Sequence, residues 1–144
     1  MEIFYKIANS IRRIYWYIFR PHTEGVKCLI EYNGEYLLIQ TSYSGNYWTL
    51  AGGGIKHGET AEQAARREVK EELGITLDAI KEIGHYESTI EYKKDTIYLF
   101  HAEVLEKVFK QNKLELANAQ WFSKNALPEN RSKALNQTII MIDK

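Results

Sequence analysis

Three glutamates, Glu68, Glu71 and Glu72, lie close together in the stretch REVKEELGI. If this stretch is helical, residues at i, i+3 and i+4 fall within roughly 100° of arc on one face. Like charges at these spacings destabilise a helix by about 0.2–0.5 kcal/mol per pair. Carboxylate oxygens suit Mg²⁺ or Mn²⁺, whereas zinc prefers cysteine and histidine. A divalent cation that offsets the repulsion is therefore the first hypothesis, and a solvated acidic face is the alternative.

The sequence also marks both ends of the helix that must carry these glutamates. Thr60 followed by Gln63 predicts a capping box at the N-terminus. Gly74 stands where a left-handed residue ends a helix. A solvated acidic face would not explain these signals or the glycine-rich stretch before them. That stretch predicts a loop whose backbone approaches a ligand closely or takes positive φ, and its glycines are Gly52, Gly53, Gly54 and Gly58.

The whole stretch from Gly53 to Ile75 resembles the Nudix box, G-x5-E-x7-R-E-U-x-E-E-x-G-U, in which U is a bulky aliphatic residue. A chance match at all nine specified positions is negligible. The resemblance covers about residues 24–142 and implies an α/β fold, a Nudix-type α/β/α sandwich with a mixed sheet, to which an N-terminal helix is added. The matching residues are Gly53, Glu59, Arg67, Glu68, Val69, Glu71, Glu72, Gly74 and Ile75.

The resemblance implies a role for each charged residue of the box. Glu68, Glu71 and Glu72 are expected to hold Mg²⁺ or Mn²⁺, and the backbone carbonyl of Gly52 to add a ligand. One of the glutamates is also expected to serve as the base. The catalytic candidates are Glu68 and Glu71, together with Arg67.

Further residues are implied to support or complete the site. Arg67 and Glu59 look like the internal pair that braces the loop against the helix and orients the carboxylates, with Gly53 as structural support. A further acid often lies on a loop shortly before a tryptophan. Glu115, six residues before Trp121, is the candidate by that placement, and its rivals are Glu87, Glu91 and Glu103.

The resemblance also implies a reaction, the hydrolysis of a pyrophosphate bond in a nucleoside diphosphate linked to another moiety. Nucleoside triphosphates, dinucleoside polyphosphates and nucleotide sugars are the substrate classes. Tyr43, Tyr47 and Trp48 are able to stack on a base, although packing suits each of them equally well. Tyr92 falls about where diadenosine polyphosphate hydrolases of the family place a tyrosine. The alternative is a nucleotide-sensing module that does not hydrolyse, but such modules usually show eroded boxes.

Composition narrows the class of protein further. The chain has 144 residues, of which 44% are hydrophobic, and this fits one globular domain. Lys+Arg and Asp+Glu are both 19, so no overall basic field would gather nucleic acid. The single cysteine, Cys28, excludes an internal disulfide and suits a reducing cytoplasm. No stretch approaches the ~20 apolar residues of a membrane span. No ligand spacing links the four histidines, which are predicted to act singly: His22, His57, His85 and His101.

The first twenty residues predict a helix with a single apolar stripe. Its isoleucines recur every three or four residues, at Ile3, Ile7, Ile11, Ile14 and Ile18. Pro21 is expected to end the helix, so residues 1–22 are predicted to extend a domain of residues 23–144. The favoured interpretation packs the helix on that domain. The alternatives are a homodimer contact or interfacial membrane binding, which Trp and Tyr beside Arg12, Arg13 and Arg20 would favour.

The rest of the chain alternates apolar runs with turn signals, which predicts strands around the helix of the glutamates. Asn33-Gly34 is a strong hairpin signal, and Lys93-Lys94-Asp95 predicts a charged turn. The predicted strands are residues 26–32, 35–42, 47–50, 80–92, 96–105 and 118–123, and a closing helix lies near residues 131–142.

Overall fold

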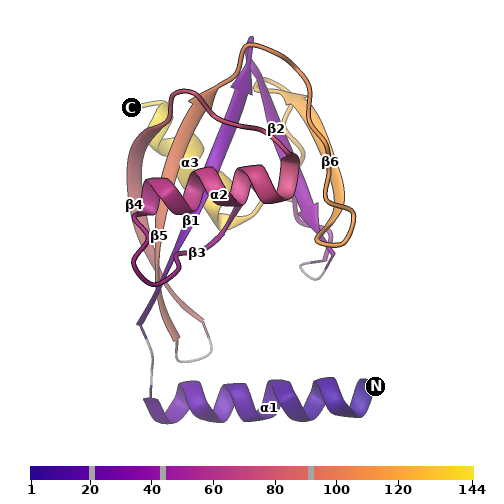
Figure 1. The fold of residues 1–144 in the computed structure, drawn as a ribbon, viewed down its shortest axis with the longest axis vertical. Coiled ribbons are helices and arrows are strands. Elements are labelled where there is room, and N and C mark those ends of the chain that lie inside the picture. Colours follow the sequence, from indigo (N-terminus) through magenta and orange to yellow (C-terminus); the bar gives the residue numbers. More distant parts are fainter. Residues whose placement is uncertain (20–21, 43–44, 91–92) are drawn as a thin grey trace.

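The computed structural model describes residues 1–19, 22–42, 45–90 and 93–144. Within these residues it contains three helices and six strands (Figure 1). The helices are α1 (Glu2–Phe19), α2 (Ala61–Leu73) and α3 (Lys133–Ile142). The strands are β1 (His22–Tyr32), β2 (Glu35–Thr41), β3 (Ala51–Gly54), β4 (Lys81–Ile90), β5 (Lys93–Glu103) and β6 (Leu116–Ser123).

All six strands belong to one mixed sheet. Its order is β4-β5-β1-β2-β6, and β3 pairs with β1 beside β2. β1 runs parallel to β5 and antiparallel to β2 and β3. The outer pairs, β2 with β6 and β4 with β5, are antiparallel. The mixed sheet predicted from the sequence is confirmed.

The sheet separates two hydrophobic clusters, and a helix closes each of them. Side chains alternate between the faces of a strand, so Cys28 and Ile30 contribute to one cluster and Leu29 to the other. α2 adds Val69 and Leu73 to the first cluster, and α3 packs against the second. Figure 1 shows α2 and α3 on opposite sides of the strands. The α/β/α architecture is therefore confirmed.

The Asn33-Gly34 turn joins β1 to β2 as predicted. Both residues have positive φ, 46° for Asn33 and 79° for Gly34. These values fit the type I′ turn, whose twist matches that of the flanking strands. The turn sets the register, in which Tyr32 faces Glu35.

The structure differs from the sequence prediction around residues 47–54. The expected strand at 47–50 is reduced to isolated bridges at Trp48 and Thr49. The regular strand, β3, starts at Ala51 and contains Gly52, Gly53 and Gly54, which were predicted as loop. Glycine has low strand propensity, but antiparallel pairing with β1 decides the conformation here.

The predicted charged turn at Lys93-Lys94-Asp95 is also wrong. β5 begins at Lys93, and Lys94 pairs with His22 at the start of β1. The side chain of Thr23 donates a hydrogen bond to Asp95. Pairing with β1 along its length outweighs the local turn preference of these charged residues.

α1 lies apart from the sheet (Figure 1). Its isoleucines Ile3, Ile7, Ile11 and Ile14 are 54–73% exposed. The side chains described here therefore do not show the packing on the domain that the sequence favoured. Across the described ranges, no helix combines the length and the hydropathy that a membrane crossing requires.

Candidate functional site

The helix that carries the glutamates begins and ends with the predicted caps. The hydroxyl of Thr60 accepts a hydrogen bond from the Gln63 N–H at 3.1 Å, and the Gln63 side chain accepts from the Thr60 N–H at 2.9 Å. Gly74 is left-handed, with φ 66°, and its N–H donates to the Lys70 carbonyl. These caps satisfy backbone groups that the helix cannot pair internally, so α2 is a rigid support.

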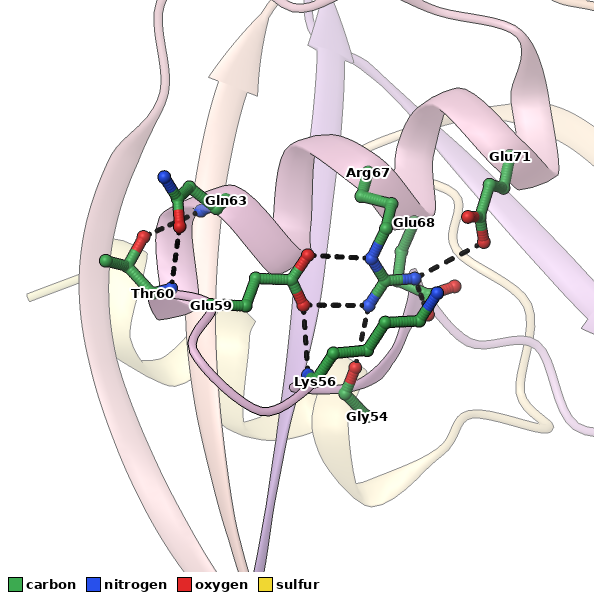
Figure 2. A network of polar contacts seen from close by, with 8 residues as sticks. All are labelled: Gly54, Lys56, Glu59, Thr60, Gln63, Arg67, Glu68 and Glu71. Atoms are coloured by element: carbon green, nitrogen blue, oxygen red, sulfur yellow. Dashed lines mark hydrogen bonds and ion pairs between the residues drawn. The ribbon is translucent and has the colours of Figure 1, made fainter.

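Arg67 connects α2 to the residues that precede it, Gly54 and Glu59 (Figure 2). Its guanidinium donates two hydrogen bonds to the Glu59 carboxylate, at 2.8 and 3.0 Å, and one to the Gly54 carbonyl at 2.9 Å. The Arg67–Glu59 pair is therefore formed as predicted, and it connects the segment after β3 to α2. A bidentate pair of this kind fixes orientation as well as position.

The ion pair shifts the pKa values of both partners. Hydrogen bonds from the Arg67 side chain, followed by the Lys56 backbone N–H, lower the pKa of Glu59 to about 2. The hydrogen bonds to Glu59 raise the pKa of Arg67 above its usual value. Both side chains are therefore charged across the physiological pH range.

The same arginine also contacts two members of the carboxylate cluster, which we define as Glu68, Glu71 and Glu72. Arg67 donates to Glu68 at 2.9 Å and to Glu71 at 3.3 Å. Part of the repulsion noted in the sequence is thus offset within the protein itself. The Glu71 side chain is 46% exposed and that of Glu68 14% exposed, so both reach solvent.

Glu72 occupies the buried end of the cluster. It is 4% exposed and accepts a hydrogen bond from the Gly52 N–H at 2.8 Å. Burial, with a smaller contribution from the charges of Glu68 and Glu115, raises the pKa of Glu72 to about 7. The Gly52 hydrogen bond and the charge of Lys27 act in the opposite direction. A carboxylate in this position has a strong preference for a nearby positive charge.

Gly53 gives Glu68 the room to approach β3. A Cβ atom at Gly53 would lie 2.5 Å from Oε1 of Glu68, closer than real contacts allow. At Gly52 a Cβ would lie 2.0 Å from the Val26 carbonyl oxygen. Close approach to the backbone of β1 therefore requires glycine at position 52, whereas a side chain at position 53 would displace the flexible end of Glu68.

The structure brings Glu115 towards the cluster, although it is distant in sequence. A backbone hydrogen bond connects the segment before Glu115 to α2: the Asn112 N–H donates to the Glu72 carbonyl at 2.9 Å. Glu115 is exposed, and its charge contributes to the raised pKa of Glu72. Its rivals lie elsewhere: Glu87 pairs with Lys94, Glu103 belongs to a separate group with His101, and Glu91 lies outside the described residues.

One of the four histidines, His101, lies in that separate group. Ligand atoms of Glu31, His101 and Glu103 lie within 4.8 Å of one another. The His101 Nε2 atom and the Glu31 carboxylate are 2.9 Å apart. The parallel pairing of β1 with β5 joins residues 70 positions apart, which sequence spacing could not reveal.

A cavity of about 360 Å³ has Lys27 in its lining, which does not include Glu68, Glu71 or Glu72. The Lys27 amine donates to the Leu50 carbonyl at 3.1 Å, and its charge acts on both Glu72 and Glu68. Burial lowers the pKa of Lys27. Lys27 was not identified from the sequence, where a lone charge in the apolar run VKCLI was the available signal. The cavity is lined by Lys27, Thr41, Tyr47, Thr49, Arg131, Ser132 and Lys133.

The aromatic candidates for substrate binding differ in their surroundings. Tyr47 lines the cavity and is 58% exposed. The Trp48 ring packs edge-on against Phe122, with 4.8 Å between centroids, and belongs to the cluster beneath α3. Tyr43 and Tyr92 lie outside the described residues.

Oxygen ligands dominate the donor set of the carboxylate cluster. Carboxylates of one solvent-facing helix, with one buried member whose pKa is raised, fit a hard divalent cation such as Mg²⁺ or Mn²⁺. Gly52 contacts the cluster through its N–H, so its backbone lies where a carbonyl ligand was expected. The assignment of that carbonyl as a ligand stays a prediction.

Comparisons with known proteins identify the family of this chain. Residues 21–141 match the family model described as NUDIX domain. The chain is 35% identical over 83 residues to the oxidized purine nucleoside triphosphate hydrolase of Danio rerio, a match that covers 56% of this chain and 52% of that protein. It is 46% identical over 55 residues to the nucleoside triphosphatase NudI of Enterobacter sp. (strain 638), covering 35% and 38%. The chain thus spans about half or less of the length of these relatives.

A solved structure shows the same fold. The crystal structure of a MutT NUDIX hydrolase from Burkholderia pseudomallei superposes with a TM-score of 0.77 and 21% sequence identity. The match covers 84% of this chain and 98% of the other. At this identity the likeness concerns the arrangement of helices and strands.

Proposed function

Because residues 21–141 match the NUDIX domain, this chain belongs to the Nudix family, and we propose that it hydrolyses a pyrophosphate bond. The substrate is a nucleoside diphosphate linked to another moiety, and a nucleoside monophosphate is one product. The observation that carries the proposal is the carboxylate cluster, which α2 presents beside β3 with Arg67 and Gly52 as its partners. We assign the catalytic domain to residues 23–144, with residues 1–22 as an N-terminal extension.

The chain's own residues supply orientation and proton transfer. Arg67 orients Glu68 and Glu71 through direct hydrogen bonds, and Gly52 orients Glu72. Glu68 and Glu71 reach solvent, so one of them accepts the proton of the attacking water. Glu72 is too buried for that role and acts as a ligand.

The residues that would hold Mg²⁺ or Mn²⁺ are Glu68, Glu71 and Glu72, with the Gly52 carbonyl and Glu115 as further candidates. A bound divalent cation neutralises charge on the pyrophosphate oxygens and lowers the pKa of a coordinated water. The ordinary repulsion between the three carboxylates, and the raised pKa of Glu72, favour such an ion.

The cavity beside Lys27 is the proposed site for part of the substrate. Three basic side chains, Lys27, Arg131 and Lys133, line it and favour a group that carries negative charge. Tyr47 offers an aromatic face for a base at the same cavity. Because the two relatives are named as nucleoside triphosphate hydrolases, triphosphates are the first class to test.

A substrate screen tests this function. Nucleoside triphosphates, dinucleoside polyphosphates, nucleotide sugars and ADP-ribose are incubated with the protein and Mg²⁺ or Mn²⁺, and products are identified by chromatography. We expect release of a nucleoside monophosphate from at least one class, dependent on the divalent ion. Nucleotide binding by calorimetry without any hydrolysis would instead support the alternative, a nucleotide-sensing module.

We propose a cytoplasmic location on the basis of the single cysteine. The single cysteine, Cys28, is buried, and burial raises the pKa of its thiol to about 12. Such a thiol is unreactive and is consistent with a reducing cytoplasm.

A further inference from the structure

We propose that α1 is a peripheral membrane anchor, which lies in the interface of an anionic lipid bilayer with its isoleucine face towards the acyl chains. The proposal is independent of the proposed activity and starts from exposure. Ile3 is 73% exposed, Ile7 54%, Ile11 62% and Ile14 58%. Phe4, on the same side, is 69% exposed. A contiguous apolar surface of this kind marks an interaction site.

The four exposed isoleucines lie on one face of the helix, although Tyr5, which is 60% exposed, lies outside it. At about 100° per residue, the four isoleucines fall within roughly 80° of arc. Lys6 and Asn9 lie outside this arc, on the polar side. The pairs of elements that pack extensively in the described part of the chain do not include α1, and Figure 1 shows it separated from the sheet. The domain therefore leaves the apolar face available.

The length and the charged residues of α1 indicate an orientation parallel to the membrane surface. Its 18 residues span about 27 Å at 1.5 Å per residue. Charged residues interrupt the sequence, and α1 does not qualify as a membrane-crossing helix. An amphipathic helix with one apolar and one basic face lies in the plane of the interface instead.

Charge selects lipid over a second copy of the chain as the occupant. Residues 1–20 contain four basic residues and one acidic residue, whereas the remaining 124 contain 15 basic and 18 acidic. An anionic lipid surface attracts this basic segment. A second α1 would carry the same net charge and repel it. The segment also contains Tyr15, Trp16 and Tyr17, residue types that are enriched at membrane interfaces.

Vesicle flotation with the full chain tests the proposal. Vesicles of phosphatidylcholine alone are compared with vesicles that also contain phosphatidylserine, at low and high salt. We expect the protein to float with the anionic vesicles at low salt and to dissociate as salt screens the attraction. A protein that stays unbound in every mixture would overturn the proposal without affecting the proposed hydrolysis.

Two matched substitutions separate insertion from simple charge attraction. Ile11→Asp and Asn9→Asp change the net charge equally, but only Ile11→Asp places a carboxylate in the apolar face. We expect Ile11→Asp to lower the floated fraction at least tenfold and Asn9→Asp to lower it much less. Equal losses would show that the isoleucine face is not inserted and would overturn the proposal.

Light scattering on the same variants examines the competing occupant. Without lipid, we expect a monomer for wild type and for Ile11→Asp, because the like positive charges of two α1 segments oppose their pairing. A wild-type dimer that Ile11→Asp dissociates would assign the face to self-association and contradict the lipid proposal. Hydrolysis of a soluble nucleotide should be the same in all three proteins, because α1 carries none of the cluster residues.

Discussion

Arg67 is the residue that links the loop, the helix and the carboxylates. It contacts Glu59 and Gly54 on one side and Glu68 and Glu71 on the other. The sequence predicted the Glu59 contact through the resemblance. The resemblance also implied that the pair orients the carboxylates, and the structure adds that Arg67 contacts Glu68 and Glu71 directly. The arginine therefore has an electrostatic role in the cluster as well as a bracing role.

The depressed pKa of Glu59 leads to a prediction about acid stability. The folded-state pKa is about 2, below the ordinary 4.5, so ionised Glu59 stabilises the fold above the unfolded-state pKa. This stabilisation is lost as the pH falls from about 5 towards 2. We expect Glu59→Gln to lower the melting temperature at pH 7 and to match wild type near pH 2.

The prediction is tested by measuring melting temperatures of Glu59→Gln and wild type across this pH range. Glu62→Gln is the control. Glu62 pairs with Arg66 at 3.1 Å, but its side chain is 53% exposed, so its loss should change stability little. Equal melting temperatures of Glu59→Gln and wild type at pH 7 would contradict the bracing role of the pair.

Lys27 leads to a prediction about substrate affinity. If the cavity accepts an anionic part of the substrate, Lys27→Met removes a charge-assisted hydrogen bond worth about 1.5–3 kcal/mol. We expect KM to rise about 10- to 100-fold at saturating divalent ion, with a smaller change in kcat. Steady-state kinetics measure this, with the exposed Lys144→Met as the charge-matched control. A KM equal to that of wild type would remove Lys27 from substrate binding.

At the scale of elements, β3 is where sequence and structure differ most. Its residues, AGGG, read as a flexible loop because glycine is disfavoured in strands. The structure instead uses their small size: β3 pairs with β1 on one side, and Glu68 approaches it from α2. These requirements come from neighbours distant in sequence, so local preference could not reveal them.

Three alanine substitutions in β3 separate these requirements. Gly52→Ala forces a Cβ against the backbone of β1, and we expect it to lower the free energy of unfolding by about 1–3 kcal/mol or more. Gly53→Ala meets only the flexible end of Glu68, so activity should fall while stability changes less. Gly54→Ala meets nothing within 4 Å and is the control.

Denaturant unfolding and activity assays on the three variants test this order. A Gly53→Ala protein that keeps wild-type activity would show that the position of Glu68 against β3 is unimportant for turnover.

Other elements were predictable to different degrees. α2 was predicted closely, because Thr60, Gln63 and Gly74 give local signals at both of its ends. The cavity was not predicted, since its lining joins β1 at Lys27 with the start of α3 at Ser132. Only the folded sheet brings those segments together.

At the scale of the whole molecule, the chain joins a mixed-sheet domain to an amphipathic helix that stands apart from it. The domain explains how the carboxylate cluster is held, since both hydrophobic clusters fix the strands that support it. The sequence predicted α1 correctly but favoured a packed position, because a periodic apolar stripe does not identify its partner. The proposed activity and the proposed anchor therefore reside in separate parts of one chain.

Hydrolysis by the Glu68→Gln and Glu72→Gln variants tests the central claim most directly. With a nucleotide hydrolysed by wild type, phosphorus NMR follows release of the nucleoside monophosphate at saturating substrate and Mg²⁺ or Mn²⁺. We predict that each variant lowers kcat by about two orders of magnitude or more, because each removes a carboxylate that holds the ion. Each variant should melt near the wild-type temperature without metal, since the relief of repulsion, about 0.2–0.5 kcal/mol per pair, opposes the weakening of a hydrogen bond from Arg67 or Gly52. Near-normal hydrolysis by both folded variants would contradict the assignment of the carboxylate cluster as the metal site.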